Sequence, residues 1–444
     1  MGLGLQGGGV EVVRHMAREG ARVTVTDLRP AEQLAESLRA IAALDVRLVL
    51  GEHRAQDFTQ ADIVVANPAV APSNPMLAAA REAGVRVTSE MALFLEACDA
   101  RIALITGTQG KSSTTNAAAQ LLAGAGFRVH VGGNIGHALL GELDVLEPED
   151  IAVVEISSYQ LEALPADFGP CARVAAVCVT NVLADHIERH GTLEAYEAAK
   201  RRILELAGDD ATLVLSGEDP RVAAWSPARG RVVRVFATEA RDTDLNIDGG
   251  RFRLGREVLG SVADLQLPGV FQRENMLAAL GLARALGASA QRLSESIRGV
   301  RGLEHRLQDL GVFAGHRVWD NAVSTTPDST LSALRALGRP PTLLCGGQAK
   351  NLSLEELAAQ ARTLVARVIT FGVSNEVLAR AFREARVETH VAGNVEDAVQ
   401  LAFASMASGE ELLFSPACAS FDAYRNFSDR ARAFRAALPR AAHA

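Results

Sequence analysis

The sequence predicts an α/β protein of three domains, and three observations indicate this fold class. Short apolar runs alternate with helix-like stretches, beginning with the runs at 22–27, 46–51 and 62–68. The alternation restarts at residue 101 and again near residue 302. The chain has 444 residues, enough for several domains of about 100–200 residues each. Alternating strands and helices are typical of parallel sheets with helices on both faces.

We expect boundaries near residues 97 and 300, which gives domains at 1–97, 98–300 and 301–444. The first and third domains are expected to be Rossmann-like. The central one is expected to hold a P-loop-type parallel sheet plus a small antiparallel sheet, because 245–269 is rich in glycine with short alternating runs.

The first candidate site is a glycine turn near the start of the chain. Gly2, Gly4 and Gly7 fit G-x-G-x-x-G, and Asp27 follows at the end of the next apolar run. Such a turn presents amide groups and a helix N-terminus to an anion. Three interpretations remain open: a turn without a ligand, a dinucleotide site, or a site for another nucleotide that carries a pyrophosphate.

Only Met1 precedes this turn, so we expect the domain to lack its first strand. We therefore expect part of the apolar face of the helix at 9–19 to lack a partner. The residues of that face are Val10, Val13 and Met16.

The second candidate site is the segment ITGTQGKSSTTN at 105–116, which follows an apolar run and leads into a helix. It misses the strict P-loop pattern, because Ile105 stands where that pattern has a glycine. Its loop glycines still let amide groups face phosphate oxygens. Lys111 supplies a positive charge for the β- and γ-phosphates, and Ser112 a hydroxyl for Mg²⁺.

Further polar groups lie at predicted strand ends and in loops. Each has a functional interpretation and a purely structural one. Glu155 ends an apolar run and suits a Mg²⁺ ligand, unless it faces water. The segment 181–203 holds His186 and Lys200, but it could be a polar loop entering a helix. Arg306 could reach a phosphate or form an interdomain salt bridge. The segment 415–427 suits a polar pocket or a plain strand-to-helix connection.

Composition excludes some classes of function. The net charge of −8 and the pI near 5.8 argue against a nucleic-acid-binding protein. Five cysteines without CxxC spacing indicate reduced thiols. With no signal peptide and no apolar run near the ~18 residues of a membrane helix, we expect a cytoplasmic, monomeric protein.

Taken together, these motifs resemble the Mur ligase family over nearly the whole chain. The resemblance rests on GLGLQG, ITGTQGKSSTT, GGNIG (132–136), EISSYQLE (155–162), NVLADHIERHG (181–191), YEAAKRRI (196–203), GLEHR (302–306), GGQAK (346–350) and SPACASFDAYRNF (415–427). It implies an ATP-dependent ligase of cytoplasmic peptidoglycan synthesis that uses Mg²⁺ at two sites. The implied reaction adds D-glutamate to UDP-N-acetylmuramoyl-L-alanine through an acyl phosphate.

The resemblance also implies roles for single residues. The catalytic residues would be Lys111, Glu155, His186 and Lys200, with Lys200 carbamylated by CO₂. The metal ligands would be Ser112, Glu155, His186 and carbamylated Lys200. ATP would contact Gly107, Thr108, Gln109, Gly110, Lys111, Ser112, Ser113, Asn275, Arg306 and Asp320. The UDP-substrate would contact Leu5, Gln6, Asp27, Arg29, Asn67, Asn134 and His186, and the amino acid Thr325, Lys350, Ser420, Phe421 and Phe427.

The chain departs from the family pattern at 320–326, where DNAVSTT stands for the usual N-D-S-K-A-T-N. The usual acid becomes Asn321 and the usual lysine Val323, so Asp320 could replace the acid one position earlier. FQ (271–272) also stands for the usual His-Asn. Four alternatives follow: a different acceptor such as L-glutamate, a folylpolyglutamate synthase, an NAD(P) oxidoreductase using the glycine turn, and a binding protein without catalysis.

Overall fold

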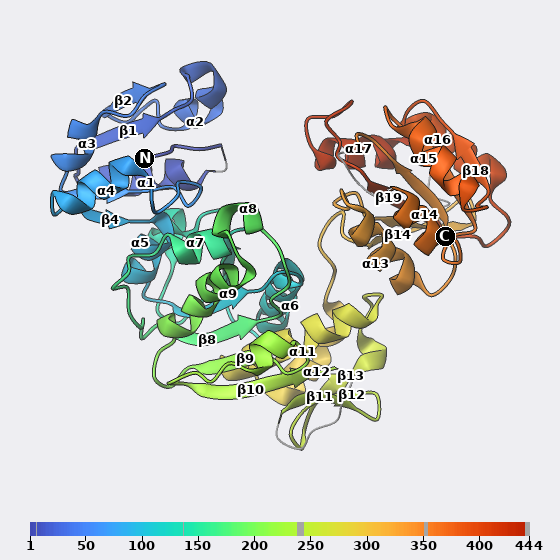
Figure 1. Cartoon of the computed structure of the whole chain (residues 1–444). Helices are drawn as coiled ribbons and strands as arrows, with labels where there is room; N and C mark the ends of the chain where they lie inside the picture. The colour runs from blue at the N-terminus through green and yellow to red at the C-terminus, as the bar shows by residue number, and fades with distance from the viewer. Residues whose placement is uncertain (6, 136, 238–243, 350–353, 440–444) are drawn as a thin grey trace. The chain divides into compact units, whose positions relative to one another are not determined.

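The computed structural model describes residues 1–5, 7–135, 137–237, 244–349 and 354–439. The chain forms two compact units (Figure 1). One comprises Met1–Gln266 and Arg273–Val300, and the other Leu267–Gln272 and Arg301–Ala444. The predicted α/β class is confirmed, and no helix in the described part of the chain has both the length and the apolar character to cross a bilayer.

The first 100 residues contain short strands and helices in alternation. Their bounds are α1 (Gly8–Arg18), β1 (Val23–Asp27), α2 (Ala35–Ala40), β2 (Val46–Leu50), α3 (Ala55–Thr59), β3 (Ile63–Val65), α4 (Pro75–Glu82), β4 (Arg86–Thr88) and α5 (Glu90–Ala97). β1 pairs with β2, and β3 pairs with β4, both in parallel.

The backbone of Met1 and Gly2 bridges these two strand pairs. Gly2 N donates to Thr26 O at 2.7 Å, and Met1 N donates to Val65 O at 2.9 Å. Two residues thus take the place where a central strand would run.

The expectation of an uncovered helix face is wrong. Val10 and Val13 are buried in a cluster with Leu3, Val25 and Ile41, and Met16 packs against the core of the central sheet. The helix finds its partners in β1 and in the chain that follows it, so the missing strand leaves no apolar gap.

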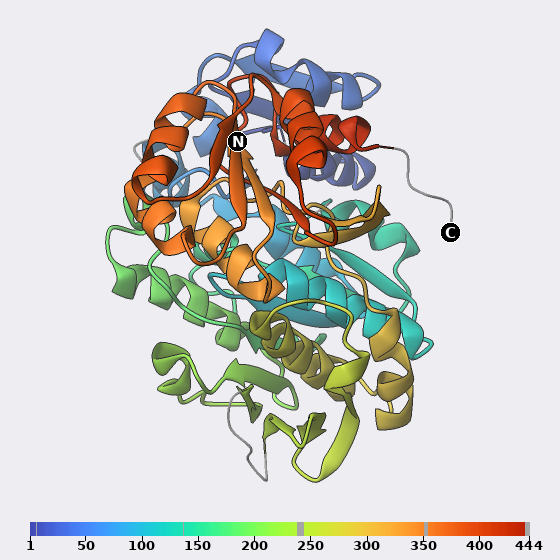
Figure 2. The same cartoon turned by 90° about the vertical axis from the view of Figure 1, so that its right-hand side faces the viewer.

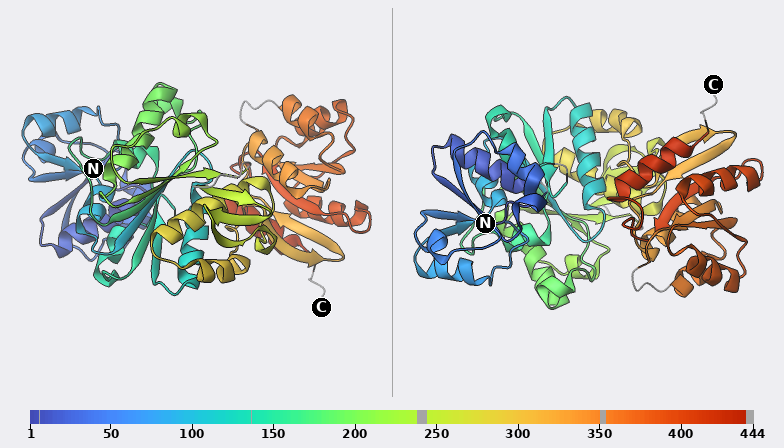
Figure 3. Two further views of the ribbon diagram at one scale, coloured as in Figure 1. Left: turned by 90° about the horizontal axis from the view of Figure 1, so that it is seen from below. Right: turned by 90° about the horizontal axis from the view of Figure 1, so that it is seen from above.

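The described residues among the next 200 build one sheet of nine strands. The elements are β5 (Arg101–Thr106), α6 (Lys111–Gly124), β6 (Val129–Gly133), the 3₁₀ helix η2 (Leu139–Val145), β7 (Ile151–Glu155), α7 (Ser158–Glu162), β8 (Val174–Val179), α8 (Ile187–His190), α9 (Leu193–Arg201), β9 (Thr212–Ser216), α10 (Pro220–Ala223), β10 (Arg231–Phe236), β11 (Leu245–Asp248), β12 (Arg251–Leu254), β13 (Glu257–Ser261), α11 (Val270–Ala285) and α12 (Ala290–Ser296). Helices cover both faces of this sheet (Figure 3).

The strand order is β13-β12-β11-β10-β9-β8-β5-β7-β6, parallel from β11 to β6. β11, β12 and β13 are antiparallel, as predicted for 245–269. They extend the edge of the parallel sheet, however, and do not form the separate small sheet that we expected. The carboxyl ends of β5, β7 and β8 lie side by side, with Ile105 paired to Glu155 and Thr106 to Val179.

The second unit is a six-stranded sheet between two layers of helices (Figure 2). Its elements are β14 (Gln308–Phe313), β15 (His316–Asp320), α13 (Pro327–Leu337), β16 (Thr342–Gly346), α14 (Leu354–Ala361), β17 (Arg367–Phe371), α15 (Asn375–Glu384), β18 (Thr389–Val391), α16 (Val395–Ser405), β19 (Leu412–Ala417) and α17 (Phe427–Ala437). The order is β14-β15-β19-β16-β17-β18, with only β14 antiparallel to its neighbour. Consecutive residues such as Leu343 and Leu344 enter opposite cores, as the two-residue period of a strand requires.

Candidate active site

The loop between β5 and α6 needs glycine at two positions. Gly107 has φ 152°, and a Cβ there would lie 1.9 Å from Thr180 Oγ1. Gly110 has φ 83°, and a Cβ there would lie 2.5 Å from Asn275 Oδ1. Ile105 is fully buried in β5. The loop therefore begins only after the position at which the strict P-loop has its first glycine.

The residues after β8 brace this loop. Asn181 Oδ1 accepts hydrogen bonds from Thr108 N at 3.2 Å and from Gln109 N at 2.8 Å. Thr180 Oγ1 donates to Gln109 O at 2.6 Å. The backbone N–H groups of Thr108 and Gln109 therefore donate to protein atoms. The first turn of α6, whose N-cap is Gly110, has no side-chain cap, so its amides and the helix dipole suit a phosphate.

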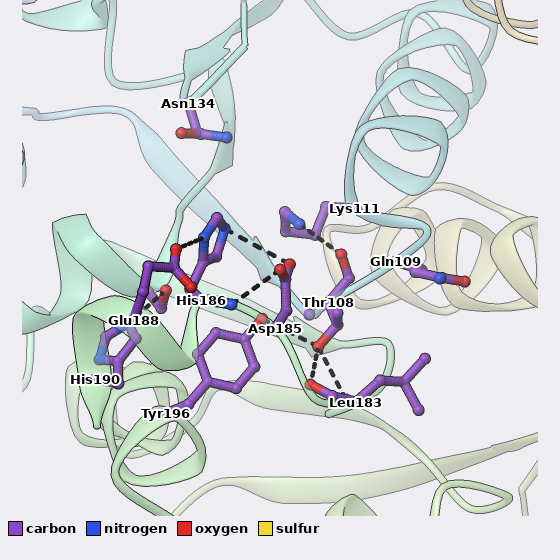
Figure 4. Close-up of polar contacts among 12 residues, drawn as sticks. Thr108, Gln109, Lys111, Asn134, Leu183, Asp185, His186, Glu188, His190 and Tyr196 are labelled. Carbon is purple, nitrogen blue, oxygen red and sulfur yellow. Dashed lines mark hydrogen bonds and ion pairs between the residues drawn. The ribbon is translucent and has the colours of Figure 1, made fainter. Parts of the chain in front are cut away.

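Thr108 joins the loop to α9 (Figure 4). Its Oγ1 lies 3.1 Å from the Tyr196 hydroxyl and accepts a hydrogen bond from Leu183 N at 2.9 Å. Lys111 Nζ folds back and donates to Thr108 O at 2.9 Å. The loop is held in shape by side chains from two neighbouring elements.

Lys200 lies directly beneath the loop. It is 1% exposed, and its Nζ donates to Gly107 O at 2.6 Å and lies 4.7 Å from the centre of the Tyr196 ring. Burial, and after it the charge of Lys111, lower the pKa of Lys200 to about 7, although Glu155 acts in the opposite direction. A large share of this amine is therefore neutral near pH 7.

Glu155 ends β7 on the other side of the loop. It is 1% exposed, which excludes the alternative of a glutamate facing water. Its Oε1 accepts a hydrogen bond from Asn134 Nδ2 at 2.8 Å. Its Oε2 is buried and has no hydrogen-bond partner among the residues that the structure describes. An orphaned carboxylate oxygen is costly unless it meets a cation, so this residue fits a Mg²⁺ ligand.

His186 stands at the start of α8, with φ 51°. Its Nε2 lies 3.5 Å from Asp185 Oδ2 and its Nδ1 3.5 Å from Glu188 Oε1, as Figure 4 shows. Among the described residues, no three His, Cys, Asp or Glu side chains gather into a metal-binding group.

In the first 100 residues the predicted substrate residues meet at the glycine turn. Asp27 is buried, and its two oxygens accept from Gly4 N at 3.2 Å and Arg29 N at 2.9 Å. Asn67 packs on the turn, with its Nδ2 3.0 Å from the place of a Cβ at Gly4. Leu5 and Arg29 are exposed. Gln6 lies outside the described residues.

Arg189, which sequence reasoning missed, ties this region to the central sheet. Its guanidinium donates to Ala69 O at 3.1 Å, Val70 O at 3.2 Å and Pro68 O at 3.3 Å. It also pairs with Glu162 and stacks on Tyr159. The loop after Asn67 is thus held by the segment that carries His186.

The second unit gathers the predicted residues of that unit at the ends of β15 and β19. Asp320 is fully buried, while Ser420 is 2% and Phe421 64% exposed. Phe427 begins α17 and lies 6.1 Å from the His305 ring. The remaining predicted residues, Arg306 and Thr325, are partly buried. Lys350 lies outside the described residues.

Sequence reasoning also missed Asn181, Thr180 and Tyr196. Asn181 and Thr180 follow β8 directly, so the rule that ligands meet the carboxyl ends of parallel strands would have found them. Tyr196 carried no such signal, because a tyrosine on a helix is more often a core residue. Asn275 was predicted, and its Oδ1 accepts a hydrogen bond from Thr114 Oγ1 in the first turns of α6 at 3.4 Å.

A cavity of about 1110 Å³ lies elsewhere in the first unit, lined by residues of β4, α4 and the loop 163–171. None of the predicted site residues lines it. The predicted residues of the first unit cluster instead at the phosphate loop and the glycine turn.

Comparison with protein families finds two matches. Residues 105–283 match the Mur ligase middle domain, and residues 1–89 match the Mur ligase MurD-like N-terminal domain. Both ranges fall within predicted domains, but the exact boundaries near 97 and 300 stay a prediction.

Relatives match over nearly the whole chain. A UDP-N-acetylmuramoylalanine--D-glutamate ligase from Geobacter metallireducens is 38% identical, covering 98% of this chain and 96% of the relative. Ligases of the same name from Roseiflexus sp. and Trichlorobacter lovleyi are each 35% identical, covering 98% and 99% of this chain and 96% and 98% of their own length.

Solved structures share the three-domain fold. MurF from Acinetobacter baumannii gives a TM-score of 0.63 at 15% identity, covering 94% of this chain and 91% of its own. UDP-N-acetylmuramate-alanine ligase from Thermotoga maritima gives a TM-score of 0.59 at 18% sequence identity. The match covers 98% of this chain and 97% of the Thermotoga maritima chain.

Proposed function

Since the chain belongs to the Mur ligase family, we propose that it is the ATP-dependent ligase that joins D-glutamate to UDP-N-acetylmuramoyl-L-alanine in peptidoglycan precursor synthesis. The arrangement around the phosphate loop supports this most: a buried amine of low pKa on one side and an orphaned carboxylate oxygen on the other. We place the protein in the cytoplasm as a monomer, without nucleic-acid or membrane partners.

ATP occupies the loop and the start of α6 in this proposal. The residues that hold it are Gly107, Thr108, Gln109, Gly110, Lys111, Ser112, Ser113, Asn275 and Arg306. Bound Mg²⁺ would supply positive charge to the phosphate oxygens. Glu155 Oε2 and the Ser112 hydroxyl would hold one ion, and His186 with carbamylated Lys200 would hold a second.

Lys200 suits carbamylation because only a neutral amine reacts with CO₂. Its pKa of about 7 provides that form near neutral pH. The product is an anion in the place of a buried cation, and it lies next to Lys111, whose charge disfavours the protonated amine. Carbamylation would therefore replace the repulsion between two positive lysines by an attraction between Lys111 and an anion at position 200.

The two remaining substrates bind elsewhere. The UDP-substrate meets the glycine turn and the path toward the phosphate loop, through Leu5, Gln6, Asp27, Arg29, Asn67, Asn134 and His186. The amino acid meets the second unit, through Thr325, Lys350, Ser420, Phe421 and Phe427.

The reaction runs through an acyl phosphate. The alanyl carboxylate attacks the γ-phosphorus of ATP, and ADP leaves. The amine of glutamate then attacks the acyl carbonyl, and phosphate leaves the tetrahedral intermediate. Lys111 neutralises charge on the transferring phosphate, and Asn134, itself held by Glu155, lines the approach of the carboxylate. Positioning and charge neutralisation account for most catalysis in reactions of this type.

The test is phosphate release from ATP and Mg²⁺ with UDP-N-acetylmuramoyl-L-alanine, comparing D-glutamate, L-glutamate and no amino acid. We expect release that requires D-glutamate and is lost in Lys111→Ala. Release with L-glutamate alone would keep the mechanism and change the acceptor. Tight substrate binding without release would instead indicate a binding protein.

A further inference from the structure

The two residues that flank Arg306 are anchored by two consecutive residues at the end of β15, His305 through its side chain and Leu307 through its backbone. His305 Nδ1 lies 2.7 Å from Asp320 Oδ2. Leu307 N donates to Asn321 Oδ1 at 3.0 Å. His305 has φ 60° and Leu307 φ 45°, a conformation that residues with a side chain rarely adopt. Such a backbone persists only where its surroundings fix it.

Arg435, on α17, completes the support. Its Nε donates to Asp320 Oδ2 at 2.8 Å, and its Nη2 donates to Gln308 Oε1 at 2.7 Å. Gln308 Oε1 also accepts from His305 N at 3.1 Å. One arginine thus braces both the carboxylate and the amide that hold His305.

The oxygens of Asp320 are engaged within the unit. Oδ2 receives His305 and Arg435, and Oδ1 accepts from Ala322 N at 3.0 Å. The side chain is fully buried. Because the side chain is fully buried, a nucleotide hydroxyl could reach this carboxylate only if the residues that cover it moved.

Both polar atoms of the Asn321 side chain are also hydrogen-bonded within the unit. The Asn321 amide donates from Nδ2 to Ser415 Oγ at 3.0 Å, while its Oδ1 holds Leu307. The departure from the family pattern at 320 and 321 therefore places a carboxylate next to an amide. The carboxylate holds the His305 side chain, and the amide oxygen holds Leu307 N.

We propose that Asp320, Asn321 and Arg435 are positioning residues that present Arg306 to the nucleotide. This gives Asp320 a different role from the direct ATP contact that the family resemblance implies. The inference rests on the proposed function, because that function makes Arg306 an ATP ligand.

The test compares Asp320→Asn, Arg435→Gln and the double variant in the full chain. We expect each single change to raise the KM for ATP and the Kd for ADP about tenfold, the effect of losing one charge-assisted contact. The double variant should be no worse than the worse single one, because both changes release the same loop. The KM values for glutamate and the UDP-substrate should stay within about twofold of wild type.

A direct contact between Asp320 and ATP predicts another result. Asp320→Asn would then weaken nucleotide binding while Arg435→Gln left it unchanged, and this outcome would overturn the proposal. Arg432→Gln is the matched control, because Arg432 lies on the same helix but pairs with Asp429 at the surface. It should bind ADP as wild type does.

Folding is checked by thermal unfolding of each variant. If Arg435→Gln does not fold, Gln308→Met removes the shared acceptor and leaves the carboxylate pair intact, with a smaller rise in the Kd for ADP expected. An unchanged Kd in that variant would also count against the proposal. If wild type binds ADP but releases no phosphate, the proposed function fails, while the ADP measurements still decide the role of the anchor.

Discussion

Lysine occurs at three positions in this chain, Lys111, Lys200 and Lys350, while arginine occurs at 42. All three lysines coincide with predicted site positions. A guanidinium keeps its charge under nearly all conditions, whereas an amine can lose its proton when buried. The proposed roles use this difference, with Lys111 as a compact charge and Lys200 as a neutral amine.

The pKa of Lys200 predicts a pH-dependent carbamate. Because this pKa is about 7, the neutral fraction rises from a minority below pH 7 to most of the protein at pH 8. At a fixed concentration of dissolved CO₂, NMR with ¹³C-labelled bicarbonate should show a carbamate signal that grows over this range. With only three lysines, the signal is assigned by its loss in Lys200→Met. Persistence of the signal in that variant would contradict the assignment.

Glu155 offers a second test, through its orphaned oxygen. Glu155→Gln keeps the shape and can still contact Asn134, but it removes the charge. We expect the Mg²⁺ concentration for half-maximal activity to rise and kcat to fall by at least about tenfold, since even indirect partners of a metal contribute that much. Thermal stability measured without Mg²⁺ should not fall, because a buried charge has been removed.

A loss of stability in Glu155→Gln would mean instead that the carboxylate serves the fold. Asn134→Ala provides the complementary variant. This variant removes the amide that donates to Glu155. We expect its thermal stability to fall below that of wild type without Mg²⁺, and the difference between the two proteins to shrink when Mg²⁺ is added.

A candidate site residue could be predicted from the sequence when a local motif contains it. A residue that only the tertiary fold brings to the site could not be predicted in this way. Lys111 and Gly110 follow from the loop motif alone. Arg189 reaches Pro68 across 121 positions of sequence, and no local pattern announces such a contact. Asp320 was expected at the nucleotide because its position in the motif is near that of the usual acid. In the structure its carboxylate contacts Arg435 and His305, and the motif announced neither contact.

The phosphate loop, taken as one element, depends on the glycine at its junction with α6. Gly110→Ala would place a Cβ 2.5 Å from Asn275 Oδ1, on a backbone with φ 83°. Gly126→Ala is a matched control, because Gly126 has φ 98° but nothing lies within 4 Å of its Cβ position. Both changes should cost about 1–2 kcal/mol through the left-handed backbone.

Only Gly110→Ala should move Asn275, and only it should raise the KM for ATP, by about tenfold or more. Measured unfolding free energies and ATP kinetics of the two variants check this. Equal effects on the KM for ATP would show that backbone strain alone, and not the contact with Asn275, explains the loss.

Strands were predicted better than their pairing. The apolar runs at 22–27, 46–51 and 101–107 became β1, β2 and β5 within one residue or two. The signal was clearest for β5, which is buried at Ile102–Thr106 and apolar from Ile102 to Ile105, as expected of a strand covered on both faces. The continuity of β11 with β10 could not be predicted, since a sequence run does not state its neighbour in a sheet. The burial of α1 could not be predicted for a similar reason: Leu3 and Ile41 cover it, and no sequence pattern states which segments pack on a helix.

Across the molecule, Arg189 is the residue through which the central sheet holds the loop after Asn67. Its guanidinium serves three carbonyls and Glu162 at once, which a lysine amine on a flexible stem cannot reproduce. We expect Arg189→Lys to raise the KM for the UDP-substrate about tenfold, because Asn67 stands directly before the released loop, and to change the KM for ATP little. Arg173→Lys, at an exposed pair with Asp99, should change neither. If Arg189→Lys raised both KM values equally, the arginine would support the whole site, and the loop after Asn67 would have no separate part in binding the UDP-substrate.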